Sequence, residues 1–121
     1  MSLIAQVFVV IAGVFHVVVF ALESLLFRKP STYRRFLVKD DTEMAAARPW
    51  AFNQGFYNLF LAIGVFVGLA LGGDAGTALV AFGTASMLAA ALVLVATDRR
   101  MLRAAAVQGV PPLLALALLW V

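Results

Sequence analysis

Apolar positions along this chain gather into four long runs, and polar positions gather between them. The runs cover residues 3–27, 50–71, 77–97 and 104–121, with connections at 28–49, 72–76 and 98–103. A helix needs about 20 apolar residues to cross the hydrocarbon core of a bilayer, and each run is close to that length. A segment in lipid must satisfy its own backbone hydrogen bonds, so each run is predicted helical. The pattern predicts an all-α fold: a polytopic membrane protein, a four-transmembrane-helix bundle forming one domain over residues 1–121.

The basic residues predict how this bundle is oriented. All nine Lys and Arg residues lie in the first and third connections: Arg28, Lys29, Arg34, Arg35, Lys39 and Arg48, then Arg99, Arg100 and Arg103. Short loops rich in Lys and Arg remain in the cytoplasm. Loops 28–49 and 98–103 are therefore predicted to be cytoplasmic, with the N and C termini on the outer, periplasmic or extracellular, side. Because this bias favours one orientation, a homodimer is compatible with it if the two copies are parallel.

Composition narrows the class of protein further. Hydrophobic residues make up 64% of the chain, charged residues 12%, and the formal net charge is +3. Because the basic residues flank apolar runs, we expect them to contact anionic headgroups of the lipid bilayer and not a nucleic acid. The first run is too long for a signal peptide and its charges follow it, so we expect a retained span. With no cysteine and a single histidine, no metal site and no cofactor are predicted.

The long connection carries its own local signals. Tyr33, Phe36 and Leu37 beside Arg34 and Arg35 indicate a short piece in the headgroup layer. Asp40, Asp41 or Thr42 is expected to cap a helix that ends at the break implied by Pro49. The last run is short and contains Pro111 and Pro112.

Polar side chains inside the runs are the candidates for function. Their depth below the cytoplasmic edge sorts them into a layer about 8 Å in and a deeper one near mid-membrane. The first layer holds Glu23, Asn53, Gln54 and Gln108, and the deeper one holds His16, Tyr57 and Asn58. Each of the first two runs has a single polar face, and the two faces are expected to meet. We predict a polar pocket that opens toward the cytoplasm and ends near His16.

Each of these groups has a structural alternative. A carboxylate inside a span costs about 3 kcal/mol on insertion scales, which favours a functional role for Glu23. Glu23 and His16, seven residues apart on one face, could exchange a proton. Alternatively, both are hydrogen-bonded residues that lock the helices together. The same two readings apply to the amides, since interhelical hydrogen bonds are worth about 1 kcal/mol each.

Small residues indicate where helices approach each other closely. Gly64, Gly68 and Gly72 form two overlapping G-x-x-x-G steps, and Gly83 lies among small residues of the third run. Such stripes are typical of helix contacts in membranes. We expect packing within the chain, and a dimer interface is the alternative.

The run Asn53-Gln54-Gly55-Phe56-Tyr57-Asn58, followed by Leu59-Phe60-Leu61-Ala62, resembles the hallmark of a family of small bacterial membrane proteins. That family is catalogued as domain of unknown function 1304. The first run agrees with it, since Glu23 follows His16 by seven residues and Phe27 follows Glu23 by four. The resemblance covers nearly the whole chain and implies four spans in the bacterial cytoplasmic (inner) membrane. It implies no established activity, substrate or cofactor.

Three functions remain open from the sequence. In the first, the protein binds or transports a small lipophilic or cationic molecule, with Glu23 as counter-ion or proton carrier. In the second, it is a membrane isomerase or hydrolase for a lipid-soluble substrate, in which Glu23 or His16 moves protons. Tyr57, Asn53 or Asn58 would then orient that substrate. In the third, it is an accessory subunit whose polar residues only pack the bundle.

Overall fold

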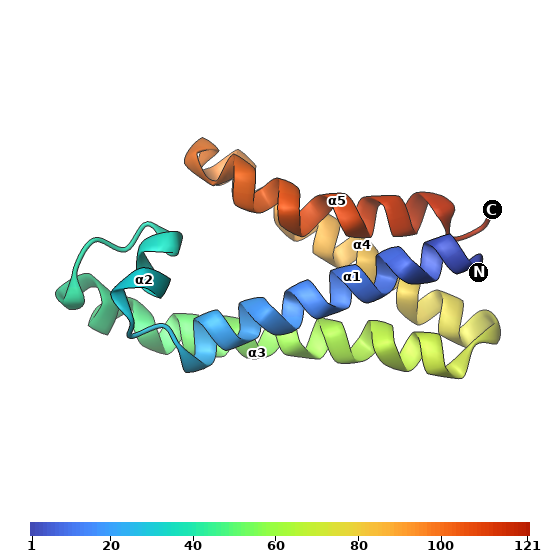
Figure 1. The fold of residues 1–121 in the computed structure, drawn as a ribbon, viewed down its shortest axis with the longest axis horizontal. Helices are drawn as coiled ribbons and strands as arrows, with labels where there is room; N and C mark the ends of the chain where they lie inside the picture. The colour runs from blue at the N-terminus through green and yellow to red at the C-terminus, as the bar shows by residue number, and fades with distance from the viewer. The chain divides into compact units, whose positions relative to one another are not determined.

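The computed structural model describes residues 1–121 and consists of helices without strands (Figure 1). The long helices are α1 (Leu3–Phe20), α3 (Asp41–Leu71), α4 (Gly73–Thr97) and α5 (Leu102–Leu118). Short elements join them: a π-helix η1 (Ala21–Leu25), α2 (Pro30–Tyr33), and the 3₁₀ turns η2 (Arg34–Phe36) and η3 (Arg99–Met101). Helices account for 88% of the residues, so the all-α prediction is confirmed.

Four helical segments are long and apolar enough to cross a membrane. They are Leu3–Leu25, Asp41–Leu71, Gly73–Thr97 and Arg99–Leu118. Each of them overlaps one of the four apolar runs. A helix of about 20 apolar residues is long enough to cross the hydrocarbon core and apolar enough to be stable there. The prediction of four membrane-spanning helices is therefore confirmed.

The second of these helices starts earlier than the sequence indicated. Asp40 caps it, since its Oδ1 accepts a hydrogen bond of 2.9 Å from the backbone N–H of Glu43. The predicted break at Pro49 is wrong, because α3 continues through this residue from Asp41 to Leu71. A proline inside a helix forfeits one backbone hydrogen bond. The good helix formers on its N-terminal side, Met44 to Ala47, maintain the helix up to the proline.

The predicted turn at residues 72–76 is shorter than expected, because α4 already begins at Gly73. Gly72 and Gly73 turn the chain with φ angles of 63° and 60°, values that glycine adopts without a steric cost. At the other end of α4, Asp98 ends the helix and then caps η3 by accepting from Arg100 N at 3.0 Å.

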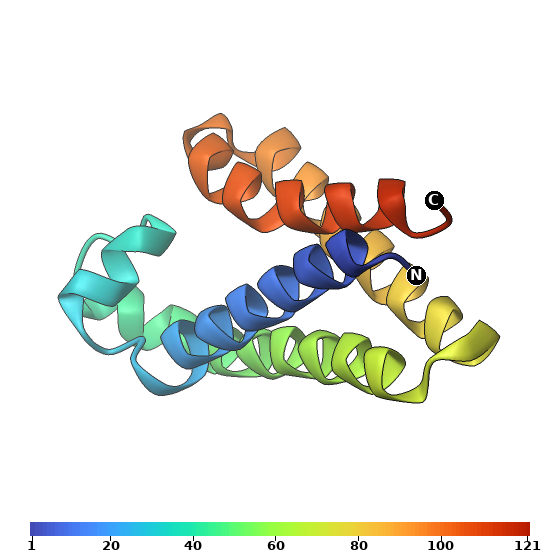
Figure 2. The ribbon, with the colours of Figure 1, turned by 45° about the vertical axis from the view of Figure 1, so that its right-hand side comes forward.

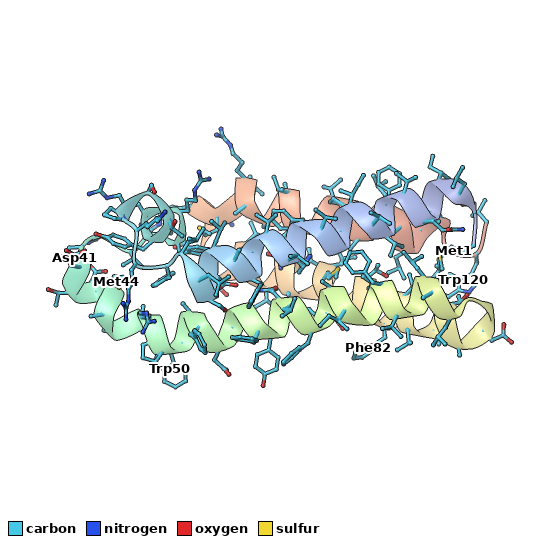
Figure 3. The ribbon with its side chains drawn as sticks, turned by 60° about the horizontal axis from the view of Figure 1, so that its bottom comes forward. Met1, Asp41, Met44, Trp50, Phe82 and Trp120 are labelled. Carbon is cyan, nitrogen blue, oxygen red and sulfur yellow. The ribbon has the colours of Figure 1, made fainter.

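The chain divides into two compact units, Met1–Phe15 with Leu61–Val121, and His16–Phe60. In the first unit α4 and α5 lie side by side and run in opposite directions (Figures 1 and 2). The N-terminus, the C-terminus and the turn at Gly72 gather at one end of this unit (Figure 1). Met1 and Trp120 mark that end in Figure 3. This arrangement is the one that an even number of alternating spans requires.

Small side chains bring the helices of the first unit together. Its core contains Val9, Ala12, Val65, Val80, Met87, Ala115 and Leu119. A Cβ added at Gly76 would meet the carbonyl oxygen of Gly68, and one at Gly83 would meet the side chain of Val65. The backbones of α3 and α4 therefore approach closely at Gly68 and Gly76, as glycine permits in membrane helices.

The second unit contains the polar connection, in which several side chains pack against one another. Tyr33 is only 3% exposed, and its hydroxyl donates a hydrogen bond of 3.0 Å to Asp41 Oδ1. The Phe27 and Phe36 rings lie 5.8 Å apart, and Leu37 takes a φ of 63° where the chain turns back. Arg34 and Arg35 remain exposed beside this cluster. The connection is thus attached to the start of α3 by a buried phenol.

Replacing Gly76 with alanine should test the close approach of α3 and α4. The added Cβ would collide with backbone, which cannot rotate away, so Gly76→Ala should lower the free energy of unfolding by about 1–3 kcal/mol. At Gly64 an added Cβ meets no atom within 4 Å. Gly64→Ala should therefore be neutral or stabilising by up to about 1 kcal/mol. Tryptophan fluorescence during unfolding in excess detergent would measure both, and equal effects would contradict the packing.

The pKa of Tyr33 should report whether the polar connection is folded. Burial, and then the hydrogen bond to Asp41, raise this pKa above the ordinary value of 10.0. A raised pKa means that the neutral phenol is favoured in the folded state. The resulting stabilisation is present below the ordinary pKa and is lost as pH rises through the raised one.

Phenolate absorbance in a Tyr57→Phe background, which leaves Tyr33 as the only tyrosine, would measure this titration. Asp41→Asn should bring the pKa closer to the ordinary value, and Asp40→Asn should have a smaller effect because Asp40 is a weaker contributor. Titration of Tyr33 at its ordinary pKa in folded protein would show that the connection is open.

Candidate functional site

The carboxylate of Glu23 lies in a π-helical turn at the end of the first span. Leu26 N donates to Ala21 O at 2.9 Å, a bond across five residues instead of four. Such a turn accommodates one extra residue and is frequently found at functional sites. The wider turn changes the direction of the side chains that follow α1, and the consecutive residues Glu23 and Ser24 both reach α3.

Glu23 bonds to the amide of Asn58 on α3. Asn58 Nδ2 donates to Glu23 Oε1 at 2.6 Å, and the same nitrogen lies 3.3 Å from the carbonyl oxygen of Gln54. Asn58 is 7% exposed, so this amide is held away from the surrounding medium. A short bond to a carboxylate is typical of a charge-assisted hydrogen bond.

Ser24 makes a second bond between the same two helices. Its Oγ donates to the carbonyl oxygen of Phe52 at 2.8 Å, and the residue is 8% exposed. Glu23 pairs with the later residue of α3 and Ser24 with the earlier one, so the two segments run antiparallel, as Figure 2 shows. The two bonds together fix the register of this helix pair.

Gly55 leaves enough space for Glu23 and Ser24 to lie this close to α3. A Cβ at this position would meet Ser24 Oγ and would lie 3.1 Å from the Cβ atoms of both Glu23 and Ser24. Only hydrogen fits there. Gly55 therefore positions the two polar residues against α3, a role that the sequence pattern alone did not assign to it.

Phenylalanine rings pack along the same stretch of this helix pair. Phe56, the residue after Gly55, lies edge-on to Phe20 with ring centroids 5.1 Å apart. Phe52 and Phe60 continue this row along α3 at centroid distances of 5.1 and 6.2 Å from Phe56. The spacing of four residues places these rings on neighbouring turns of one side of the helix. The helix pair that carries the carboxylate is thus also joined by an aromatic contact.

The structure brings together only part of the predicted pocket. Glu23 and Asn58 are in contact, and His16 is fully buried on α1 in the same unit. The side chains of Asn53, Gln54 and Tyr57 are exposed, and Tyr57 reaches 59% exposure. Gln108 is half-buried on α5 and belongs to the other unit. The polar face predicted for the second run is wider than one helix contact, so Asn58 is buried while Asn53, Gln54 and Tyr57 remain exposed.

Two cavities lie away from these residues, within the first unit. One of about 360 Å³ is bordered by Gln6, Asp74, Thr77 and the glycines of the α3–α4 turn. The other, of about 200 Å³, is apolar and lies between α4 and α5. Neither is lined by a residue predicted for the pocket. No group of three or more His, Cys, Asp or Glu side chains is placed to hold a metal ion.

The predicted packing glycines also divide into two pairs. Gly68 and Gly83 lie at contacts, since an added Cβ would meet Val80 at 2.8 Å and the side chain of Val65, respectively. Gly64 and Gly72 have no atom within 4 Å of an added Cβ, so they do not pack within the chain. The buried stripe of α3 is instead formed by Gly55, Asn58, Ala62, Val65 and Gly68.

Comparisons with known proteins identify a family without an assigned activity. The family model described as protein of unknown function (DUF1304) matches residues 10–120. No curated protein and no solved structure matches the chain. The matched range includes Glu23, Asn58, Ser24 and Gly55, so the polar contact lies inside the part that the family shares.

Substitutions at Gly55 and Ser24 should show non-additive effects on stability. Gly55→Ala should lower the free energy of unfolding by about 1–3 kcal/mol, because its Cβ collides with Ser24. Ser24→Ala should cost about 1 kcal/mol for the lost hydrogen bond. Because Ser24→Ala removes the closest colliding atom, the double variant should be more stable than the sum by at least about 0.5 kcal/mol. Pairing Ser24→Ala with the open position Gly64→Ala should be additive, and additivity in both pairs would contradict the contact.

Proposed function

This chain belongs to the DUF1304 family, and we propose that it binds a small lipophilic cation within the membrane, with the Glu23 carboxylate as the counter-ion. The observation that carries the proposal is the hydrogen bond of 2.6 Å between Glu23 and Asn58 at the end of a membrane span. It supports a carboxylate that is held in a fixed position and paired with a neutral group.

The energetic cost of this carboxylate supports a functional role. An ionisable residue inside a span costs about 3 kcal/mol on insertion scales and is by default a functional candidate. A carboxylate offers about four acceptor positions, and the Asn58 amide uses one of them. A cation beside Glu23 would neutralise a charge that a single amide donor does not neutralise.

The surroundings of the carboxylate favour a cation that is also lipophilic. Phe20 and Phe56 lie on the two helices that carry Glu23 and Asn58. The faces of aromatic rings attract cations, and their edges and sides bind apolar substituents. A quaternary or aromatic cation would satisfy the carboxylate and the rings together, whereas a small hydrated ion would leave the rings unused.

We further propose that this site opens toward the cytoplasm. The nine Lys and Arg residues support this orientation, because they lie in the connections after the first and third spans. Glu23 is five residues from Arg28, and is therefore within about 8 Å of that end of the span. Exchange of a bound cation with the cytoplasm would need only a short path, and coupling of this site to the opposite side would make the protein a transporter.

A structural role is the second candidate, and a specific observation favours it. Both polar bonds of the site join η1, the end of the first span, to α3, so the same groups that would meet a ligand also hold the helix pair. In that case Glu23 and Ser24 would determine stability and nothing else. The two proposals differ in what happens when the carboxylate is replaced by its neutral isostere.

Binding of tetraphenylphosphonium to purified protein in detergent would test the proposal. Glu23→Gln keeps the side-chain shape and should weaken binding about tenfold or more, which corresponds to ~1.4 kcal/mol. Glu43→Gln removes an exposed carboxylate from the start of α3 and should leave affinity unchanged. Equal affinity of the wild type and Glu23→Gln, or no binding by folded wild type, would contradict the proposal. A loss of stability alone in Glu23→Gln would identify the structural role.

A further inference from the structure

The side of α3 opposite its buried stripe carries a second regular row of residues. Alternating steps of four and three residues connect its members, which we call the outer stripe: Asn53, Tyr57, Phe60, Gly64, Val67 and Leu71. At 100° per residue they fall within an arc of roughly 80°. Tyr57, Phe60 and Leu71 are each about 60% exposed. Phe60 also lies beside Phe56, with ring centroids 6.2 Å apart, and none of the six residues belongs to the buried core.

Two members of the outer stripe are polar within a segment that is apolar enough to span a membrane. Trp50 extends from α3 into the surroundings (Figure 3), and tryptophan marks the interface between headgroups and hydrocarbon. Asn53 and Tyr57 follow it by about one and two helical turns, on the side of the hydrocarbon core. An amide in hydrocarbon without a hydrogen-bond partner is costly. Polar side chains of membrane helices therefore lie where another helix can bond to them.

We propose that the outer stripe of α3 is the interface of a parallel homodimer. An asparagine amide is both donor and acceptor, so Asn53 complements a second Asn53. In a two-fold symmetric, parallel pair, identical residues meet at the same depth. The orientation predicted by the nine basic residues is the same for every copy, so this is the arrangement that two copies can adopt.

The spacing and the glycine of the stripe fit this occupant. Steps of four and three average 3.5 residues, the repeat of two helices that cross at a small left-handed angle. Gly64 lies in the middle of the stripe, and an added Cβ there would meet no atom within 4 Å. The glycine has no packing role in one chain, whereas a second helix could approach it closely.

Cysteine cross-linking can test the interface cleanly, because the chain has no native cysteine. Single variants Tyr57→Cys, Phe60→Cys and Val67→Cys would be oxidised in liposomes that contain only this protein. Two exposed positions off the stripe serve as matched controls: Ile63→Cys on α3 and Phe82→Cys on α4, where Figure 3 shows the ring extending outward. We expect dimer formation at the stripe positions and only background at the controls.

Two further variants separate assembly from folding. Gly64→Leu adds a side chain whose Cβ meets no atom within 4 Å, so the monomer should fold while cross-linking at Phe60→Cys falls to background. Asn53→Leu should weaken dimerisation about fivefold, the effect of losing an interhelical hydrogen bond of ~1 kcal/mol. Cross-linking that is equal on and off the stripe would overturn the proposal. So would absence of cross-linking at every stripe position in folded protein, or a Gly64→Leu variant that dimerises normally.

Discussion

The structure depends on one constraint: a polar group placed in a membrane must find its hydrogen-bond partner within protein. Glu23 and Ser24 satisfy this constraint on α3, through Asn58 and the carbonyl of Phe52. Those bonds require the backbones to come close, and the close approach requires Gly55. A single energetic rule thus determines the register of the first span against α3 and requires a glycine at position 55.

The same constraint explains how much could be predicted from the sequence. The number and nature of the spans followed from the length of the apolar runs, because lipid leaves few alternatives to a helix. That the polar faces of the first two spans meet also followed, but Glu23 bonds to Asn58, which the sequence placed in the deeper layer, and not to Asn53 or Gln54 at its own predicted depth. The ends of the helices were harder to predict from the sequence. The continuation of α3 through Pro49 depends on the helix-forming residues before it, which outweigh the usual effect of a proline.

The details of the site depended on features that have weak sequence signals. The π-turn at Ala21–Leu25 changes the direction of the Glu23 and Ser24 side chains, and no residue type in the sequence predicts such a turn. On α3, the polar face predicted from the helical period was broader than the contact with the first span, so it included the exposed residues Asn53 and Tyr57. Gly55 and Gly64 look alike in the sequence. They differ in what lies next to them in the structure, because Ser24 and Glu23 approach Gly55 and no atom of the chain approaches Gly64. The distinction between the two sides of α3 therefore needed three-dimensional structure.

The length of α3 has a mechanical consequence. Its 31 residues extend over about 46 Å, whereas the hydrocarbon core of a bilayer is about 30 Å thick. About ten residues of the same continuous helix therefore project beyond the core, and Asp41 at the tip accepts a hydrogen bond from Tyr33. If α3 tilts or rotates within the membrane, its projecting end would move with it. A movement that includes Glu23 and Asn58 would then also move the polar connection, which lies outside the bilayer.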